Sequence, residues 1–164
     1  MSNFQHELSI TRFIDAPPET VYRVYTERTE QWWAPAPWKT RIAAFDLRPG
    51  GRFAFEMEGP GGENHPEESV VLEAVPGERI VLTNAFAAGW EPRTTMDSDC
   101  DFPSVTLVTF EPEGSGTRYT ARVRHWTEAA LKAHEAMGFE QGWSMVAAQL
   151  AGLAEAEAHA AVAA

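Results

Sequence analysis

Histidine and carboxylate side chains are the residues of this chain that could transfer protons, and two of them stand out by position. His125 ends a strand-like segment in phase with the apolar Tyr119 and Val123, so it should point inward. An inward histidine is either a core residue satisfied by one hydrogen bond or an acid–base group. Glu68 is in phase with the apolar Val70, Leu72 and Ala74, which would place it on the inner face. If it faces His125 or a ligand hydroxyl there, its carboxyl group would be the second acid–base group. Otherwise Glu68 is a solvated charge at the sheet edge.

No sequence motif for a metal site, a phosphate-binding loop or a serine nucleophile has the residue spacing that such a site requires. The five histidines show no close pairing, and the single cysteine, Cys100, cannot complete a sulfur site. Asp97, Asp99 and Asp101 imitate the first ligands of a calcium loop, but Phe102 replaces the glycine that such a loop requires. Phosphate-binding loops and the GxSxG serine elbow do not occur. We therefore expect no metal and no cofactor.

Aromatic side chains make up 11% of the chain, which is generous for a small protein. The side chains that we expect to line a ligand pocket are Trp32, Trp33, Phe53, Phe55, Trp90, His125, Phe139 and Trp143. The alternative is that these rings only fill a core, as aromatic stripes usually do. Both interpretations stand, because a single helix over a wide sheet leaves a volume that side chains or a ligand must fill.

Alternation of apolar and polar residues predicts the strands that must position these side chains. The predicted strands are 8–14, 40–47, 51–58, 68–75, 79–84, 104–111 and 117–126. The sequence RPGG supplies the backbone angles of a hairpin turn between the second and third strands. Segment 59–66 is a Gly/Pro-rich loop, and the long loop 85–103 either covers the rim of the core or has a function.

Helical patterns occur in two places. Segment 15–20, DAPPET, is typical of a helix start, and a second short piece carries Trp32 and Trp33. From Thr127 onward, apolar residues recur at spacings of three and four, which predicts a long C-terminal helix. Gly138 indicates either a break in that helix or a close approach by a backbone or ligand.

This order of elements predicts an α+β fold. A curved antiparallel sheet wraps around a long C-terminal helix, and two short helices lie between the first and second strands. A chain of 164 residues suits a single domain over 1–164, for which we expect an ordered core of about 7–157.

The net charge limits the kinds of partner that the protein can bind, and the cysteine count indicates the compartment in which it occurs. The net charge of −11 argues against nucleic acid and anionic membrane surfaces as partners. Arg118, Arg122 and Arg124 alternate along one strand, which indicates a solvated face. One cysteine excludes an internal disulfide, and no signal peptide or apolar run of membrane-spanning length is found. We expect a cytoplasmic protein.

Three stretches, together with the order of elements, resemble a known family: RPGG at 48–51, DAPPETVYRVYT at 15–26 with its downstream WW, and HEAMGFEQGWSMVAAQL at 134–150. The chain resembles the START-like (SRPBCC) superfamily, in the branch named after the activator of the Hsp90 ATPase. The resemblance covers Leu8 to Glu155 and implies a helix-grip architecture that encloses a hydrophobic cavity for small apolar ligands. Members resemble one another in fold but include lipid carriers, hormone receptors and aromatic cyclases, so the site must decide the function.

Three hypotheses about function follow. The first is an intracellular binding protein that encloses a small apolar or aromatic molecule between the sheet and the C-terminal helix, without a cofactor. The second is a cofactor-free cyclase, dehydratase or hydrolase that uses His125 with Glu68. The third, suggested by the resemblance, is a module that stimulates a chaperone ATPase and would need an exposed apolar patch. A homodimer formed through a sheet edge or the C-terminal helix stays open.

Overall fold

Seven strands form one antiparallel sheet in the order β1-β9-β8-β5-β4-β3-β2. The computed structural model describes residues 4–94 and 101–164. The strands are β1 Glu7–Ile14, β2 Lys39–Phe45, β3 Arg52–Glu58, β4 Asn64–Val75, β5 Arg79–Thr83, β8 Ser104–Glu113 and β9 Gly116–His125. Two short strands, β6 Phe86–Ala87 and β7 Glu91–Pro92, pair with each other. All seven segments predicted from alternation are confirmed as strands of the main sheet.

The helices lie close to their predicted positions, except that the second short helical piece ends at Gln31 and does not include Trp32 and Trp33. Helix α1, Pro18–Glu27, and the 3₁₀ turn η1, Thr29–Gln31, connect β1 to β2, and helices α2, Glu128–Ala136, and α3, Phe139–Ala163, follow β9. The amide N–H of Ala130 donates a hydrogen bond to Oγ1 of Thr127 at 3.1 Å, which caps α2.

Gly138 separates α2 from α3. Its φ of 90° lies in the left-handed region, which favours glycine, so the predicted break is confirmed. A Cβ at this position would meet no atom within 4 Å. The backbone angle, rather than a close neighbour, therefore explains why glycine suits this position.

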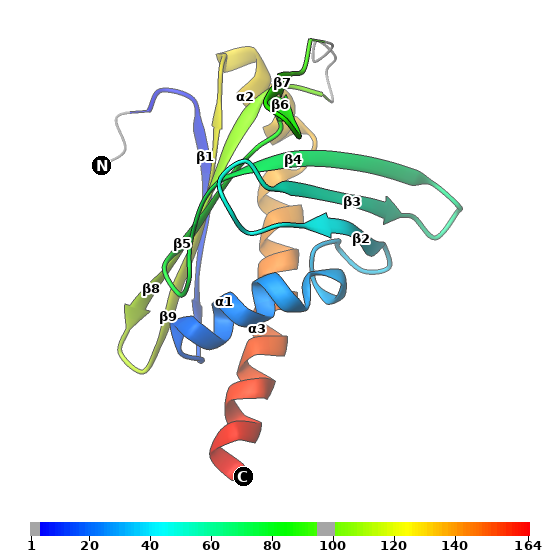
Figure 1. Ribbon diagram of the computed structural model, residues 1–164. Coiled ribbons are helices and arrows are strands. Elements are labelled where there is room, and N and C mark those ends of the chain that lie inside the picture. Colours follow the sequence, from blue (N-terminus) through cyan, green and yellow to red (C-terminus); the bar gives the residue numbers. More distant parts are fainter. Residues whose placement is uncertain (1–3, 95–100) are drawn as a thin grey trace.

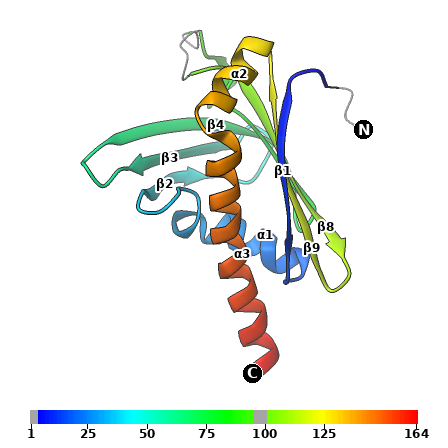
Figure 2. The same ribbon diagram turned by 180° about the vertical axis from the view of Figure 1, so that it is seen from behind.

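The sheet wraps around α3. Figure 1 shows β2, β3 and β4 bending away from β1, β8 and β9, so that the two parts of the sheet stand on either side of the helix. From behind, in Figure 2, α3 runs across the open side of the sheet and its C-terminal end extends past α1. This arrangement confirms the predicted α+β, helix-grip fold, with two short helical segments between the first two strands.

A glutamine of α3 fixes the helix to the segment that follows η1. Nε2 of Gln149 donates hydrogen bonds to the carbonyl oxygens of Trp32 and Ala34 at 2.9 and 2.8 Å, and Oε1 accepts from the amide of Ala36 at 3.0 Å. Leu150, the next residue of α3, is fully buried in the core. The middle of α3 is therefore held tightly against the structure that precedes β2.

Strand β4 begins at Asn64, four residues earlier than predicted. Part of the predicted loop 59–66 therefore belongs to a hairpin with β3, in which Glu56 pairs with Pro66. Proline is tolerated here because β4 pairs with β5 only from Val70 onward, so the first half of β4 has a neighbouring strand on one side only.

The outer face of the sheet carries ion pairs. Arg118 pairs with Glu113 at 2.8 Å, and Arg124 pairs with Glu7 at 2.8 Å. These arginines therefore have acidic partners on the outer face. Within residues 4–94 and 101–164, no helix is long and apolar enough to cross a membrane.

Candidate functional site

Four of the predicted site residues pack together in the centre of the fold. With Tyr25 they form a cluster that we call the aromatic core: Tyr25, Trp32, Trp33, Phe53 and Phe55. Ring centroids lie 4.6 Å apart for Tyr25 and Trp32 and 5.1 Å apart for Trp33 and Phe53. Trp32 and Phe53 are no more than 2% exposed, and Trp33 is half-buried. Such packing stabilises a fold and leaves little surface to a ligand.

A second group of rings lies at the end of β9, where α2 turns back over the sheet. We call it the histidine cluster: Phe102, His125, His134, Phe139 and Trp143. The centroids of His134 and Phe139 are 5.0 Å apart, as are those of Phe139 and Trp143. Phe139 is buried, whereas Phe102, His134 and Trp143 are half-buried. Unlike the aromatic core, this cluster leaves three of its rings partly accessible.

The two histidines are joined by a hydrogen bond. Nε2 of His125 lies 2.9 Å from Nδ1 of His134, and Nδ1 of His125 lies 3.2 Å from the carbonyl oxygen of His6. Burial lowers the pKa of His125. Burial, followed by the neighbouring His125, lowers the pKa of His134 to about 4. Both imidazoles are therefore neutral at neutral pH, and each can donate one hydrogen bond and accept another.

Of the two alternatives for Glu68, the structure supports a charged group at the sheet surface over an acid–base partner of His125. Nη2 of Arg52 donates to Oε2 of Glu68 at 3.1 Å, and the amide of Ala88 donates to Oε1 at 3.4 Å. The bond from Arg52 lowers the pKa of Glu68. Glu68 is therefore an ionised partner of Arg52 on the outer face, and the acid–base pair behind the enzyme hypothesis does not form.

A β-bulge explains the error. The register of β4 against β5 shifts between Val71 and Glu73, so residues on either side of Leu72 are out of phase. Val71 and Ala74 both contact the core, although alternation alone would place them on opposite faces. Counting backward from Ala74 across the bulge assigns Glu68 to the inner face, where it does not lie.

Glu67, the neighbour of Glu68, lies on the inner face opposite Phe55. Desolvation raises the pKa of Glu67, the charge of Asp101 raises it further, and Arg93 and His65 act in the opposite direction. The side chain is nevertheless accessible to solvent. Glu67 is therefore an accessible carboxyl group whose ionised form is disfavoured by the protein around it.

Trp90 does not join either cluster. It is 51% exposed, and its ring partner among the described residues is Phe86, at 6.1 Å between centroids. The ring also lies against Gly50, where an added Cβ would come within 3.1 Å of it. The structure therefore places Trp90 at the turn between β2 and β3, apart from the other predicted wall residues.

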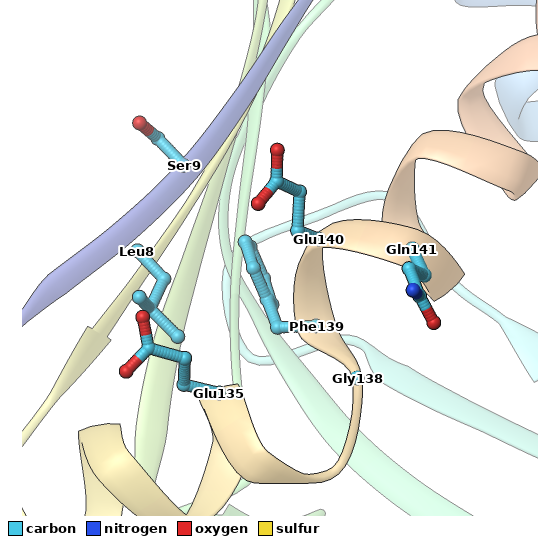
Figure 3. A pocket seen from close by; sticks show the side chains of 7 residues that line it. All are labelled: Leu8, Ser9, Glu135, Gly138, Phe139, Glu140 and Gln141. Atoms are coloured by element: carbon cyan, nitrogen blue, oxygen red, sulfur yellow. The ribbon is translucent and has the colours of Figure 1, made fainter.

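A separate hollow of about 340 Å³ lies between β1 and the junction of α2 with α3. It is lined by Leu8, Ser9, Glu135, Gly138, Phe139, Glu140 and Gln141. In Figure 3 the ring of Phe139 points toward β1, whereas Gln141 points away from it. Because Phe139 also contacts His134 and Trp143, its ring belongs both to this hollow and to the histidine cluster.

Metal-binding groups are not assembled in the part of the chain that the structure describes. No three histidine, cysteine or carboxylate side chains within residues 4–94 and 101–164 are placed to hold a metal ion. Asp97, Asp99 and Cys100 lie outside the described residues.

Comparison with known proteins identifies the family of this chain. Residues 15–155 match the family model described as Activator of Hsp90 ATPase homolog 1-like protein. The chain belongs to this family. The chain is 31% identical to a Nitrosomonas europaea protein of known structure, with a TM-score of 0.83 over 96% of this chain and 98% of that one. A Chromobacterium violaceum protein is 26% identical, with a TM-score of 0.73 over 92% and 97% of the two chains.

The same fold extends to more distant members. A structure described as the AHSA1 protein of Silicibacter pomeroyi is 17% identical, with a TM-score of 0.67 over 89% of this chain and 95% of that one. No curated protein matches the chain. The family match confirms the resemblance to the branch of the START-like superfamily that is named after the Hsp90 ATPase activator. At that general level it supports a domain that binds ligands or acts on the Hsp90 ATPase.

Sequence reasoning missed Glu67, Phe102 and His134. A hairpin centred on Gly61 pairs Phe55 with Glu67, so the correct turn position would have identified the inward carboxyl group. A helix that starts at Thr127, directly after β9, brings its second turn back over the end of the strand. The helix position therefore brings His134 near the end of β9, but the angle between α2 and β9 decides whether it contacts His125.

Proposed function

We propose that this member of the family binds a small, largely aromatic molecule at the histidine cluster, on the inner side of the sheet. Phe102 and Trp143 contribute apolar walls, and His134 contributes a polar edge. The observation that carries the proposal is the incomplete burial of Phe102, His134 and Trp143 in a cluster of mutually contacting rings. A ligand ring that completes the cluster would remove apolar surface from water.

The aromatic core supports this assignment by contrast. Its Trp32 and Phe53 are buried by side chains of the protein itself, so a ligand could reach them only after the core opens. The histidine cluster needs no such rearrangement, because three of its rings are already partly accessible. We therefore assign the aromatic core to stability and the histidine cluster to binding.

Glu67 suggests how far the site extends. Asp101, whose charge acts on Glu67, directly precedes Phe102 of the histidine cluster. Glu67 therefore lies near the cluster, and a ligand long enough to reach it would meet a carboxyl group of raised pKa. Such a group accepts or donates a hydrogen bond according to its protonation.

The binding test compares tryptophans inside and outside the cluster. A library of uncharged aromatic compounds is titrated into the native protein, and intrinsic fluorescence and thermal unfolding are followed. Compounds that bind should quench tryptophan fluorescence, and Trp143→Ala should weaken their binding by about tenfold. Trp126→Ala is the matched control, because Trp126 is 54% exposed, and it should leave the affinity unchanged. Equal losses in both variants, or no binding across the library, would refute the proposal.

The family description favours a second candidate function, stimulation of the Hsp90 ATPase. Large apolar side chains are exposed at several elements, among them Phe13 of β1 and Met145 of α3. ATP turnover by purified Hsp90, measured with and without this protein, tests that candidate. Stimulation that survives Trp143→Ala would assign it to a surface other than the histidine cluster.

A further inference from the structure

The carbonyl oxygen of His6 determines where His125 carries its proton. This oxygen lies 3.2 Å from Nδ1 of His125, and a carbonyl can only accept a hydrogen bond. Nδ1 of His125 must therefore carry the hydrogen. In the neutral ring the other nitrogen, Nε2, is then left with a lone pair.

His125 in turn determines the tautomer of His134. The lone pair on Nε2 of His125 lies 2.9 Å from Nδ1 of His134, so Nδ1 of His134 must be the donor. The second nitrogen of His134, Nε2, is then also unprotonated. Through these two hydrogen bonds, one backbone carbonyl oxygen determines the tautomer of a histidine on α2.

Nε2 of His134 is available to a partner from outside the protein. No residue of the described part of the chain forms a hydrogen bond with it. It is also not among the buried polar atoms without a partner in that part of the chain, which are Trp32 Nε1, Thr40 Oγ1 and Glu157 Oε2. The imidazole that carries this atom is half-buried, and the rings of Phe102, Phe139 and Trp143 contact it.

We propose that Nε2 of His134 is the hydrogen-bond acceptor of the ligand site, and that it selects aromatic compounds with a hydroxyl group, of which phenols are the simplest class. This inference rests on the proposed function. The ligand ring packs against Trp143 and Phe102, and its O–H donates to the lone pair of Nε2. A carboxylate or phosphate is disfavoured, because it would bring lone pairs against a lone pair. His125 is a positioning residue that acts through His134.

The first test measures the tautomers directly in the unmodified protein. Long-range ¹H–¹⁵N correlation spectra of the ¹⁵N-labelled protein at neutral pH show which ring nitrogen of each histidine carries the proton. His134 and His125 should both be protonated at Nδ1 and bare at Nε2, with His65 and His159 as references in the same spectrum. A proton on Nε2 of His134 would overturn the inference. In His125→Phe, the His134 ring should gain the Nε2-protonated form, a change that a merely structural role of His125 does not predict.

The second test uses two ligands that differ only in the donor, 2-naphthol and 2-methoxynaphthalene. The wild-type protein should bind 2-naphthol about threefold to tenfold more tightly, as expected for one hydrogen bond. His134→Phe keeps the ring contacts and should bind both compounds equally, whereas the control His159→Phe should keep the preference. Equal binding of both compounds to the wild type would overturn the inference but leave the proposed function intact. Binding of neither, with no binding across the aromatic library, would remove both.

Discussion

The aromatic core and the histidine cluster are built from the same kinds of side chain and differ in how completely the protein buries them. Trp32 and Phe53 of the core are sealed, whereas Phe102 and Trp143 of the cluster keep part of their surface. The ring contacts of the core join tryptophan, phenylalanine and tyrosine, whereas the cluster contains two neutral histidines in hydrogen-bond contact. Aromatic content alone therefore does not identify a binding site, but incomplete burial beside a polar atom does.

The two regions lie at different places along α3, one at its middle and one at its start. Gln149 ties the middle of the helix to the segment after η1, next to Trp32. At its start, α3 is joined to α2 through Gly138, and short pieces of β9, α2 and the segment before β8 meet there. The rings that meet at this junction, Phe102, His134 and Trp143, keep part of their surface accessible.

The largest expected effect concerns the aromatic core. Phe53→Ala removes a fully buried ring and should lower the free energy of unfolding by about 3–5 kcal/mol. Phe102→Ala, in the half-buried cluster, should cost less than half as much. Urea unfolding of both variants measures the comparison. Equal losses of unfolding free energy in the two variants would show that the aromatic core and the histidine cluster are buried to the same degree.

The next effect is the response of the histidine cluster to acid. Because the pKa of His134 is lowered from 6.5 to about 4, the unfolded chain takes up a proton before the folded protein does. The free energy of unfolding should therefore fall as pH drops from about 6.5 to about 4. Each pKa unit corresponds to about 1.4 kcal/mol, but the half-buried ring is screened by solvent, so we expect on the order of 1–2 kcal/mol.

His134→Phe isolates this effect from the titration of carboxyl groups and of His125, whose pKa is also lowered. The pH dependence of wild type minus variant should show the loss between about pH 6.5 and 4 and be flat above it. A difference that stays flat through this range would show that His134 is solvated and not part of a packed cluster.

A smaller effect tests the junction that shapes the cluster. Gly138→Ala forces a side chain into the left-handed region and should cost about 1–2 kcal/mol. Gly142→Ala is the matched control, because Gly142 lies within α3 and its Cβ would meet nothing within 4 Å. That variant should stabilise the protein by up to about 1 kcal/mol. Thermal unfolding of both variants separates them, and effects of the same sign would contradict the assigned break.

The smallest effect compares two neighbouring carboxyl groups on opposite faces of β4. The raised pKa of Glu67 means that the folded protein disfavours its ionised form, so the wild type loses stability as pH rises through that pKa. Glu67→Gln removes this loss and should raise the unfolding midpoint at neutral pH by about 1 °C. Glu68→Gln should lower it slightly, because Glu68 pairs with Arg52. Shifts of the same sign in both variants, or a lower midpoint for Glu67→Gln, would contradict the assignment of the two faces.

Alternation and turn chemistry were enough to predict the sheet, because inward apolar residues recur at every second position of each strand. The start of β4 was missed because Pro66 is tolerated on a stretch that has one neighbouring strand. The inward position of His125 was predicted correctly, since no bulge interrupts its strand. Glu68 was placed on the wrong face because a bulge between Val71 and Glu73 reverses the alternation.

The histidine pair shows what pattern reasoning cannot supply. The contact of His125 with His134 depends on the angle at which α2 leaves β9, which no periodicity encodes. The division of the aromatic residues into a sealed and an open group likewise depends on packing between distant elements. Trp90 illustrates the same point, since its loop folds toward Gly50 rather than toward α3.

Intermolecular nuclear Overhauser effects show directly whether an aromatic ligand completes the histidine cluster. Protein labelled with ¹³C and ¹⁵N is saturated with unlabelled 2-naphthol, and contacts between ligand and protein protons are recorded. We expect contacts to the rings of Trp143 and His134. Contacts confined to the exposed Trp90 or Trp126, or to the hollow beside Leu8, would contradict the proposed binding site.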